Sequence, residues 1–202
     1  MSLKQHTNTW ISEAEYLQGE QISDAKHEYI DGHVYAMAGA SRNHERIAGN
    51  IFAELRLHLK DKPCEPFVSD LKVKAGRAFF YPDVMVVCQD HGGDDYYTEQ
   101  PIILVEVLSK STRRIDETVK RIAYQAIPTL QEYILVEQDI VDVEVCRRSA
   151  GWVSQHYFMG DSVTFESVGL TMTVEDIYGR VTNDDVKTFL EERAVLAMKG
   201  AL

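Results

Sequence analysis

The sequence predicts an α/β fold: a mixed central β-sheet flanked by helices, with an N-terminal hairpin and further strands and a helix at the C-terminal end. Two apolar runs, Tyr81–Val87 and Ile102–Ser109, are bounded by turn residues, which is typical of strands in a buried sheet. Two amphipathic segments, Asn43–Leu59 and Arg113–Ile127, have the period of helices that pack on such a sheet. Short loops join the first strands, which favours antiparallel neighbours.

The N-terminal region contains a short helix and a hairpin. Ile11–Leu17 is predicted to be helical behind the N-cap residue Ser12. Lys26–Met37 is typical of a β-hairpin, because Asp31-Gly32 between two apolar runs favours a type I′ turn.

Each of the two longer helices is identified by a stripe of apolar residues. In the helix at 43–59 the stripe consists of Ile47, Ala48, Ile51, Phe52, Leu55 and Leu59. In the helix at 113–127 it consists of Ile115, Val119, Ile122, Ala123 and Ala126. Pro63 and Pro66 follow the first helix and Pro128 ends the second, since proline cannot continue a helix.

Seven strands are expected along the chain. In order they are Phe67–Val73, Ala78–Cys88, Ile102–Ser109, Tyr133–Val136, Val141–Arg147, Val153–Phe158 and Ser162–Phe165. A polar loop at 89–95 separates the second strand from the third, and a helix at Asp184–Met198 ends the series. We therefore expect a single domain over residues 1–202, with a core at about 41–147 and extensions at 1–40 and 148–202.

Composition and cysteine spacing predict a protein of the cytoplasm. Hydrophobic residues make up 45% of the chain, which is enough for a full core, and no apolar run approaches the roughly 18 residues of a membrane span. Met1–His6 has no apolar stretch, so no signal peptide is expected. Cys64, Cys88 and Cys146 are odd in number and widely spaced, which argues against a disulfide framework or a zinc site and favours small buried residues in a reducing compartment.

The charge of the chain argues against nucleic-acid binding. The formal net charge is −11, whereas phosphate contacts need a positive surface. Basic residues nevertheless gather in two stretches, one at Lys72, Lys74 and Arg77 and one after Glu106. The second stretch consists of Lys110, Arg113, Arg114, Lys120 and Arg121.

Two carboxylates are placed inside the apolar strand candidates. Asp83 and Glu106 have no Lys or Arg within either strand, and burying an ionised carboxylate costs several kcal/mol unless a partner or a metal compensates it. If the register aligns them, both carboxylates converge on one point. Together with a backbone carbonyl, which we expect from Val107, and with waters, they form an oxygen site suited to Mg²⁺ or Mn²⁺.

These residues resemble the PD-(D/E)xK nuclease core, and the chain is similar to the Uma2 family, also called DUF820, of restriction-endonuclease-like proteins. The likeness extends from about Trp10 to Tyr178. It rests on Tyr81-Pro82-Asp83-Val84, on Glu106-Val107-Leu108-Ser109, on the helix that holds Lys120 and Tyr124, and on Tyr133-Ile134-Leu135-Val136. The resemblance implies a Mg²⁺-dependent endonuclease that hydrolyses DNA.

One position departs from the nuclease pattern. The Lys of (D/E)xK is replaced by Leu108, which cannot orient a water or offset phosphate charge. The resemblance implies that Lys120 on the following helix takes this role, although the helical period puts Lys120 on the flank of the apolar stripe. Lys110 is nearer in sequence, but we expect it in a loop.

Further polar candidates come from helices and from the hairpin. His44 falls in the middle of the stripe of the first long helix, so we expect it to face the sheet, either as a hydrogen-bonded histidine of the core or as a neighbour of the metal ligands or a phosphate contact. Tyr124, one turn after Lys120, is a candidate donor to a carboxylate or phosphate, with packing as the alternative. Glu28 is a weaker candidate as a partner of a basic residue, and Asp70 as a partner of Lys72.

Two other functions remain open beside the DNA endonuclease. One is a binding module for nucleic acid or protein that keeps the fold without catalysis, because Leu108 replaces the Lys and the chain is acidic. The other is a hydrolase of RNA or small phosphodiesters. P-loop, serine-hydrolase and His-Glu-x-x-His patterns are absent from the sequence.

A nuclease that cuts both strands of a DNA duplex needs two active sites, so we expect a homodimer, with Val153, Phe158 and Phe165 as candidate interface residues.

Overall fold

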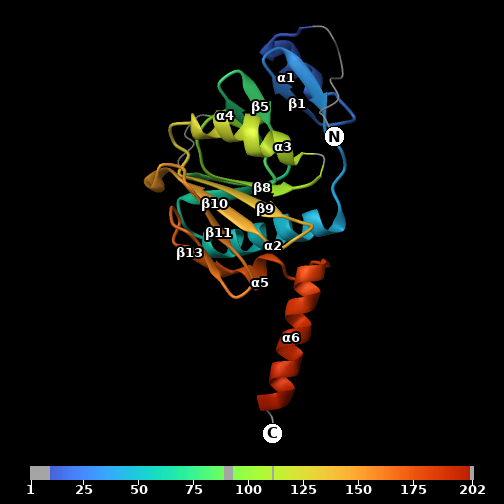
Figure 1. The fold of residues 1–202 in the computed structure, drawn as a ribbon. Helices are drawn as coiled ribbons and strands as arrows, with labels where there is room; N and C mark the ends of the chain where they lie inside the picture. The colour runs from blue at the N-terminus through green and yellow to red at the C-terminus, as the bar shows by residue number, and fades with distance from the viewer. Residues whose placement is uncertain (1–9, 89–92, 111, 201–202) are drawn as a thin grey trace.

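The computed structural model describes residues 10–88, 93–110 and 112–200. Met1–His6 and the first part of the expected polar loop at 89–95 lie outside the described residues. The fold is α/β, as predicted, and its main elements form two sheets with helices around them (Figure 1).

The larger sheet has the strand order β11-β10-β9-β8-β6-β3. Its strands are β3 (Cys64–Val68), β6 (Val84–Cys88), β8 (Pro101–Leu108), β9 (Glu132–Glu137), β10 (Val143–Arg147) and β11 (Ser154–Tyr157). β8 and β9 are parallel, and the other neighbouring pairs are antiparallel. The sheet is therefore mixed, as the short connections between its first strands predict.

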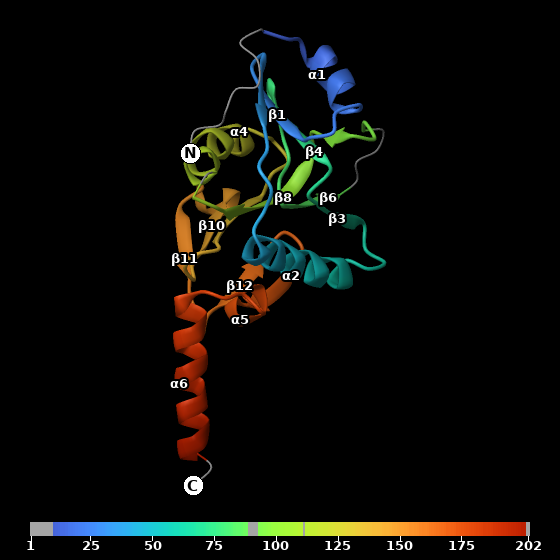
Figure 2. The ribbon, with the colours of Figure 1, turned by 90° about the vertical axis from the view of Figure 1, so that its right-hand side faces the viewer.

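The second sheet has the order β2-β1-β5-β4-β7 and lies toward the N-terminal end of the molecule (Figure 2). Its strands are β1 (His27–Ile30), β2 (His33–Ala36), β4 (Lys72–Ala75), β5 (Ala78–Phe80) and β7 (Tyr97–Thr98). A separate hairpin pairs β12 (Ser162–Phe165) with β13 (Leu170–Thr173).

The helices are α1 (Glu13–Glu20), α2 (Arg42–His58), α3 (Arg113–Ile115), α4 (Arg121–Gln125), α5 (Val174–Ile177) and α6 (Asp184–Gly200). A π-helical segment, Asp116–Lys120, joins α3 to α4, and a 3₁₀ turn spans Arg148–Ala150. Helix α2 covers one face of the larger sheet, and α3 and α4 cover the other (Figure 1).

Each face of the larger sheet has its own apolar core. On the α2 face, Ile47, Ile51 and Leu55 pack with Val84 and Val105. On the α4 face, Tyr124 and Leu130 pack with strand residues that include Met85, Leu104, Leu108 and Leu135. Because side chains alternate along β8, Glu106 points to the α4 face together with Leu104 and Leu108.

The N-terminal predictions are confirmed. Ser12 accepts a hydrogen bond from the Glu15 backbone N–H while the Glu15 carboxylate accepts one from the Ser12 N–H, which forms a capping box at α1. Asp31 and Gly32 both have positive φ angles, 47° and 91°, as a type I′ turn between β1 and β2 requires. The apolar stripe of α2 is buried as expected, apart from a half-buried Phe52.

The strand predictions near Asp83 were wrong in their boundaries. The expected strand Ala78–Cys88 is two strands, β5 and β6, which belong to different sheets, and the expected Phe67–Val73 is likewise divided between β3 and β4. The chain crosses from one sheet to the other at Tyr81-Pro82-Asp83, where proline lacks the N–H of a sheet ladder. Asp83 therefore lies at the end of β6 and not inside a strand.

The predicted stripe of the second long helix was also wrong. Val119 and Ile122 are exposed, and so is Ala126, whereas Asp116, Lys120, Tyr124 and Ile127 are buried. A π-helical turn contains one more residue than the period of 3.6 allows, so it changes which side chains face the sheet. Polar residues of this helix therefore face inward, and of the predicted stripe only Ile115 and Ala123 are half-buried.

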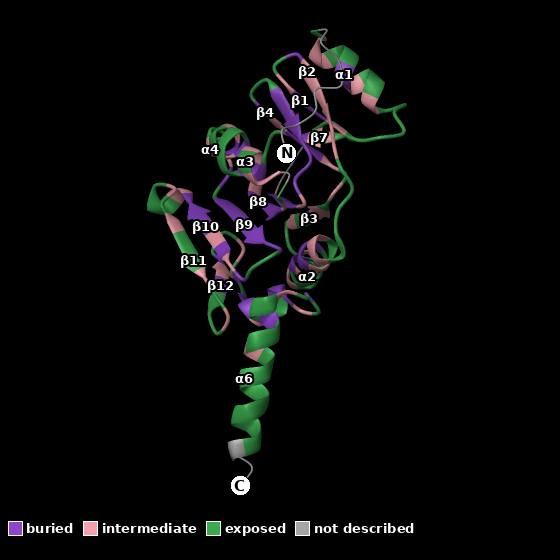
Figure 3. Cartoon of the chain, turned by 45° about the vertical axis from the view of Figure 1, so that its right-hand side comes forward, coloured by how far each residue is buried: buried purple, intermediate pink, exposed green. Residues whose placement is uncertain are grey.

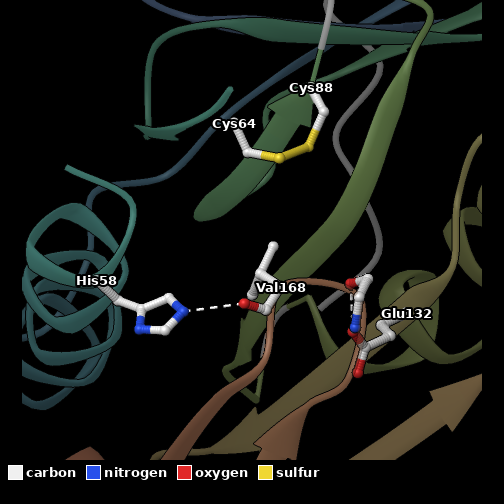
Figure 4. The surroundings of a disulfide bond; sticks show 6 residues. His58, Cys64, Cys88, Glu132 and Val168 are labelled. Atoms are coloured by element: carbon white, nitrogen blue, oxygen red, sulfur yellow. Dashed lines mark hydrogen bonds between the residues drawn. A yellow bond between two sulfur atoms is a disulfide. The ribbon is translucent and has the colours of Figure 1, made fainter. Parts of the chain in front are cut away.

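The cysteine prediction was wrong for two of the three residues. Cys64 on β3 and Cys88 on β6 form a disulfide, and only the third, Cys146, is a free and buried cysteine among the described residues (Figure 4). The two bonded residues face each other in the antiparallel register, with their Cα atoms 4.1 Å apart. Their separation of 24 residues in sequence does not show this proximity, since strand pairing creates it.

Helix α6 extends away from the rest of the molecule, and most of its surface is exposed (Figure 3). Phe165, one of the three expected interface residues, is buried in the core and is not available for an interface, whereas Val153 and Phe158 are exposed. Within the described ranges, the structure contains no helix that is long and apolar enough to cross a membrane.

Candidate active site

Asp83 directly precedes β6, and Glu106 lies on the adjacent strand β8, two residues before that strand ends. β6 and β8 are antiparallel with Val84 opposite Val105, so one residue further along this register brings Asp83 opposite Glu106. The Asp83 carboxylate accepts a hydrogen bond of 2.6 Å through Oδ2 from the backbone N–H of Val107. This bond replaces a ladder hydrogen bond and ties the Asp83 side chain to β8, beside Glu106.

His44 reaches the same carboxylate from the first turn of α2. Its Nε2 lies 3.2 Å from Asp83 Oδ2, and its buried Nδ1 has no hydrogen-bond partner within the described part of the chain. Burial lowers the pKa of His44, but the hydrogen bond to Asp83 and the charge of Asp83 outweigh it, so the pKa is raised above the ordinary value. The expectation that His44 faces the sheet is confirmed.

Lys120 is buried in a cage of three carboxylates. Its Nζ lies 2.9 Å from Glu28 Oε1, 3.1 Å from Glu106 Oε1 and 3.1 Å from Asp116 Oδ1. Desolvation lowers the pKa of Lys120, but the charges of Asp116, Glu106 and Glu28 raise it well above its ordinary value. Lys120 therefore carries a positive charge beside Glu106, as a substitute for the motif lysine that Leu108 replaces would require.

The π-helical segment explains how Lys120 reaches this place. Asp116 and Lys120 are its first and last residues, and Tyr124 follows one turn later on the same buried face. Tyr133 on β9 donates a 3.0 Å hydrogen bond to the backbone carbonyl of Asp116, which ties the segment to the sheet. Such π-helical segments occur often at functional sites, because they reorient side chains that a regular helix would place elsewhere.

Tyr124 donates a 2.8 Å hydrogen bond from its hydroxyl to Glu106 Oε1. Burial, and after it the charge of Glu106, raise the pKa of Tyr124 well above its ordinary value, so the hydroxyl keeps its proton and remains a donor. Tyr124 also packs edge-to-face against Phe80 and Tyr133. Tyr124 is therefore both a hydrogen-bond donor to a carboxylate and a packing residue of the core.

The site contains more negative than positive groups. Glu28, Asp83, Glu106 and Asp116 face one lysine and one histidine. Burial raises the pKa of Glu28, Glu106 and Asp116, and for each of them the charge of Lys120 is the largest opposing effect. A charge surplus of this kind is relieved by bound protons or by a cation.

The free oxygens of the Asp83 and Glu106 carboxylates fit a cation. All contacts of Asp83 side-chain oxygens with described residues use Oδ2, and all those of Glu106 use Oε1. One oxygen on each carboxylate is thus left for a ligand. In the described part of the chain, no three His, Cys, Asp or Glu side chains are arranged to hold a metal ion, so a cation here would also need a backbone carbonyl, such as that of Val107, and water.

Four other residues considered in the sequence analysis lie at different distances from this site. Leu108 is buried in the apolar core, and Lys110 is exposed in the loop after β8, as expected. Glu28 is the partner of a basic residue, Lys120, as expected. Asp70 pairs with Lys26 and not with Lys72, so that expectation was wrong.

Asp116 was missed at the sequence level. It lies outside the predicted apolar stripe, and its position in the expected helix carries no metal or nuclease motif. A signal was present in the spacing of Asp116, Lys120 and Tyr124 at intervals of four, which places three polar groups on one helical face.

This fold and site define a class: proteins with a restriction-endonuclease-like core, in which two carboxylates from adjacent segments of the sheet lie near a buried lysine. Residues 13–175 match the Uma2 family, whose description is "Putative restriction endonuclease", and the chain belongs to this family. The fold is shared with the crystal structure of a putative nuclease belonging to DUF820 from Anabaena variabilis ATCC 29413, with a TM-score of 0.70. That match has 17% sequence identity and covers 85% of this chain and 99% of the other.

Two relatives from Synechocystis sp. (strain ATCC 27184 / PCC 6803 / Kazusa) are similar over most of the chain. Uncharacterized protein slr1290 is 36% identical over 174 residues, which cover 83% of this chain and 91% of the relative. Uncharacterized protein sll1609 is 38% identical over 143 residues, which cover 68% and 81%. Family and fold together support a nuclease function in general.

Proposed function

We propose that the chain is a Mg²⁺-dependent endonuclease that hydrolyses phosphodiester bonds of DNA. The observation that carries this proposal is the pair of carboxylates Asp83 and Glu106, each with one oxygen free of contacts with described residues, and with buried Lys120 beside Glu106. Asp83, Glu106 and the carbonyl of Val107 are the proposed ligands of Mg²⁺ or Mn²⁺. A divalent cation supplies an activated water and positive charge at the phosphoryl oxygens.

The protein groups have separate roles in this proposal. Lys120, held in its cage, offsets negative charge that develops on the phosphoryl group. Tyr124 orients Glu106 through the 2.8 Å hydrogen bond, and His44 orients Asp83. The Nδ1 atom of His44 is buried and has no partner among the described residues.

Metal binding is tested by calorimetric titration of Mn²⁺ into the wild-type protein and into Asp83→Asn. We expect the substitution to weaken binding strongly, because it removes one of two anionic ligands. Asp70→Asn is a matched control, since Asp70 is exposed and pairs with Lys26 away from the site. Equal Mn²⁺ affinity in wild type and Asp83→Asn would remove the proposed metal site.

Activity is tested with plasmid DNA, single-stranded DNA, RNA and a small phosphodiester, each with Mg²⁺, Mn²⁺ or EDTA. Cleavage of DNA that requires a metal and is lost in Asp83→Asn supports the proposal. Cleavage of RNA or the small ester alone favours the second hydrolase function, which the charge of −11 makes a real alternative. If no substrate is cleaved with any metal, the protein is better described as a binding module that lost catalysis when Leu108 replaced the motif lysine.

A further inference from the structure

A pocket of about 780 Å³ lies next to the candidate active site. The start of α2 lines it with Arg42, Asn43 and Arg46, and the loop after β8 lines it with Ser109 and Lys110. His44 lies between these α2 residues in sequence, and Ser109 follows soon after Glu106. Two of the segments that line the pocket therefore also carry His44 and Glu106, and Gln138, Asp139 and Thr182 also line it.

Within the described residues, the cations of this pocket have no carboxylate partner in an ion pair. Arg42 and Lys110 are exposed, and none of Arg42, Arg46 and Lys110 forms an ion pair with a residue in the described ranges. The Arg46 guanidinium makes one hydrogen bond to a described residue, a long one of 3.4 Å to the side chain of Asn43. One acidic residue, Asp139, also lines the pocket.

Several other arginines of this acidic chain form ion pairs with carboxylates. Arg113 pairs with Glu137, Arg121 with Glu144, and Arg147 with Glu132 and Glu166. Three cations without such partners around one pocket therefore form a local positive surface on a chain with a net charge of −11. Guanidinium groups bind phosphate in a planar, bidentate manner, which suits a polyanion.

We propose that this basic pocket binds backbone phosphates of a polynucleotide, on one side of the phosphodiester that is cleaved, through Arg42, Arg46 and Lys110. The proposal rests on the nuclease function proposed above and specifies its substrate. The three cations lie outside the pair Asp83–Glu106, so a substrate contacts them only if it has phosphates beyond the reacting one. A polynucleotide meets this condition, and a small phosphodiester does not.

The test measures binding apart from cleavage. Labelled single-stranded and double-stranded DNA and RNA oligonucleotides are titrated in EDTA, by fluorescence anisotropy, with Arg42→Gln, Arg46→Gln, Lys110→Gln and the double variant Arg42→Gln/Arg46→Gln. We expect the double variant to raise Kd by about tenfold or more. The slope of log Kd against log salt should fall by about 0.7–0.9 for each phosphate whose cationic partner is removed.

A matched control is present on the same helix. Arg56, in the last turn of α2, is exposed and pairs with Glu65, so Arg56→Gln removes the same charge from the same helix away from the pocket. We expect Arg56→Gln to change Kd less than twofold. If each pocket variant behaves like Arg56→Gln, the proposal is overturned.

Asp139 provides a test of opposite sign. Asp139→Asn should lower Kd, because it removes the acidic residue that opposes phosphate in the pocket, whereas Glu54→Gln, at an exposed position of α2, should not. A destabilised or distorted fold does not produce tighter binding, so this result separates phosphate recognition from a structural role. Unchanged binding in Asp139→Asn, together with unchanged binding in the arginine variants, counts against the pocket.

Kinetics distinguish failure of this proposal from failure of the nuclease function. With polynucleotide substrate we expect KM to rise in Arg42→Gln while turnover of a small phosphodiester stays unchanged. If the wild type cleaves nothing but its oligonucleotide binding depends on the pocket, the nuclease function fails and the phosphate pocket stands. If cleavage is normal in all pocket variants and binding is unaffected, the pocket fails and the nuclease function stands. A wild type that neither binds nor cleaves overturns both.

Discussion

Lys120 has a structural and a proposed chemical role at the same time, because its ammonium group lies within 3.1 Å of three buried carboxylates. Removing one partner of a buried charge cluster leaves the others uncompensated, which destabilises a protein by roughly 3–5 kcal/mol. A simple loss of activity in a Lys120 variant would therefore not identify its role. The carboxylates of the cage offer a way to separate the two contributions.

We predict that Lys120→Ala lowers turnover by roughly 10²-fold or more, the usual scale for losing one group that stabilises the transition state. It should also lower the melting temperature. In the triple variant Lys120→Ala/Glu28→Gln/Asp116→Asn the melting temperature should recover, because no unpaired carboxylate of the cage remains except Glu106, while turnover stays low. Recovery of both quantities would show that Lys120 acts only on stability.

The raised pKa of Glu106 determines how the stability of the metal-free protein depends on pH. Burial raises its pKa well above the ordinary value, and the charge of Lys120 opposes this only in part. Between the unfolded and folded pKa values the folded state holds the extra proton, so stability falls as pH rises through this interval. The interval begins near the ordinary glutamate pKa of about 4.3.

We predict that Glu106→Gln, in EDTA, loses less stability than the wild type when pH rises above this value. Denaturant unfolding at a series of pH values measures the difference. Added Mg²⁺ should stabilise the wild type at neutral pH, because it binds the folded state, and should have a smaller effect on the variant. Parallel stability curves for both proteins in EDTA would contradict the charge surplus inferred for the site.

Among the elements, the helix from Arg113 to Gln125 has the largest influence on the site. Its π-helical segment brings Asp116 and Lys120 to the sheet and leaves Val119 and Ile122 in solvent. A regular helix with the predicted apolar stripe would bury hydrophobic residues and expose the lysine. The same rotation that turns Asp116 and Lys120 toward the sheet therefore turns Val119 and Ile122 toward solvent.

The pair of strands β3 and β6 carries the disulfide between Cys64 and Cys88. The bond closes a loop of 24 residues in sequence separation, for which loop entropy gives an upper value of about 3.5 kcal/mol. This loop contains β4, β5 and Asp83, so the bond restricts the segment that positions the aspartate.

We predict that the oxidised protein, unfolded without reductant, exposes one reactive thiol, that of Cys146, and that it exposes three after reduction. The double variant Cys64→Ser/Cys88→Ser should melt on the order of 10 °C lower than the oxidised wild type. Cys146→Ser is the matched control, because it removes a cysteine and keeps the disulfide. Three reactive thiols before reduction would show that the bond does not form in solution.

At the scale of the whole molecule, α6 stands apart from the other elements (Figures 1 and 2). Large apolar side chains on it are exposed, namely Leu190, Val195, Leu196 and Met198. A single helix of this length is only marginally stable in water without packing. A partner for this surface would stabilise it, and a second copy of the chain would also supply the second active site that a duplex cutter needs.

We predict a homodimer that depends on α6. Light scattering should give twice the monomer mass for the wild type, and the monomer mass for Leu190→Glu/Leu196→Glu. Lys187→Gln/Glu191→Gln serves as control, since it changes an exposed ion pair of the same helix without adding charge to the apolar positions. A monomeric wild type at high protein concentration would show that this prediction is wrong.

Local patterns in the sequence were sufficient to predict several elements correctly. The cap at Ser12, the Asp31-Gly32 turn and the stripe of α2 each depend on residues within a few positions, so period and turn chemistry reveal them. The same kind of pattern predicted that His44 faces the sheet and that Glu106 lies on a strand, but it placed Asp83 inside a strand, whereas Asp83 precedes β6.

Tertiary structure alone decided the features that join distant segments. The strand expected at Ala78–Cys88 is divided between two sheets, Cys64 meets Cys88, and Glu28 and Asp116 meet at Lys120. Strand register and the packing of one element on another determine these contacts, and hydrophobic periodicity contains no information about either. The π-helical segment belongs to this group, because the pairing of its buried charges with Glu28 and Glu106 favours a face that the apolar pattern of the helix does not predict.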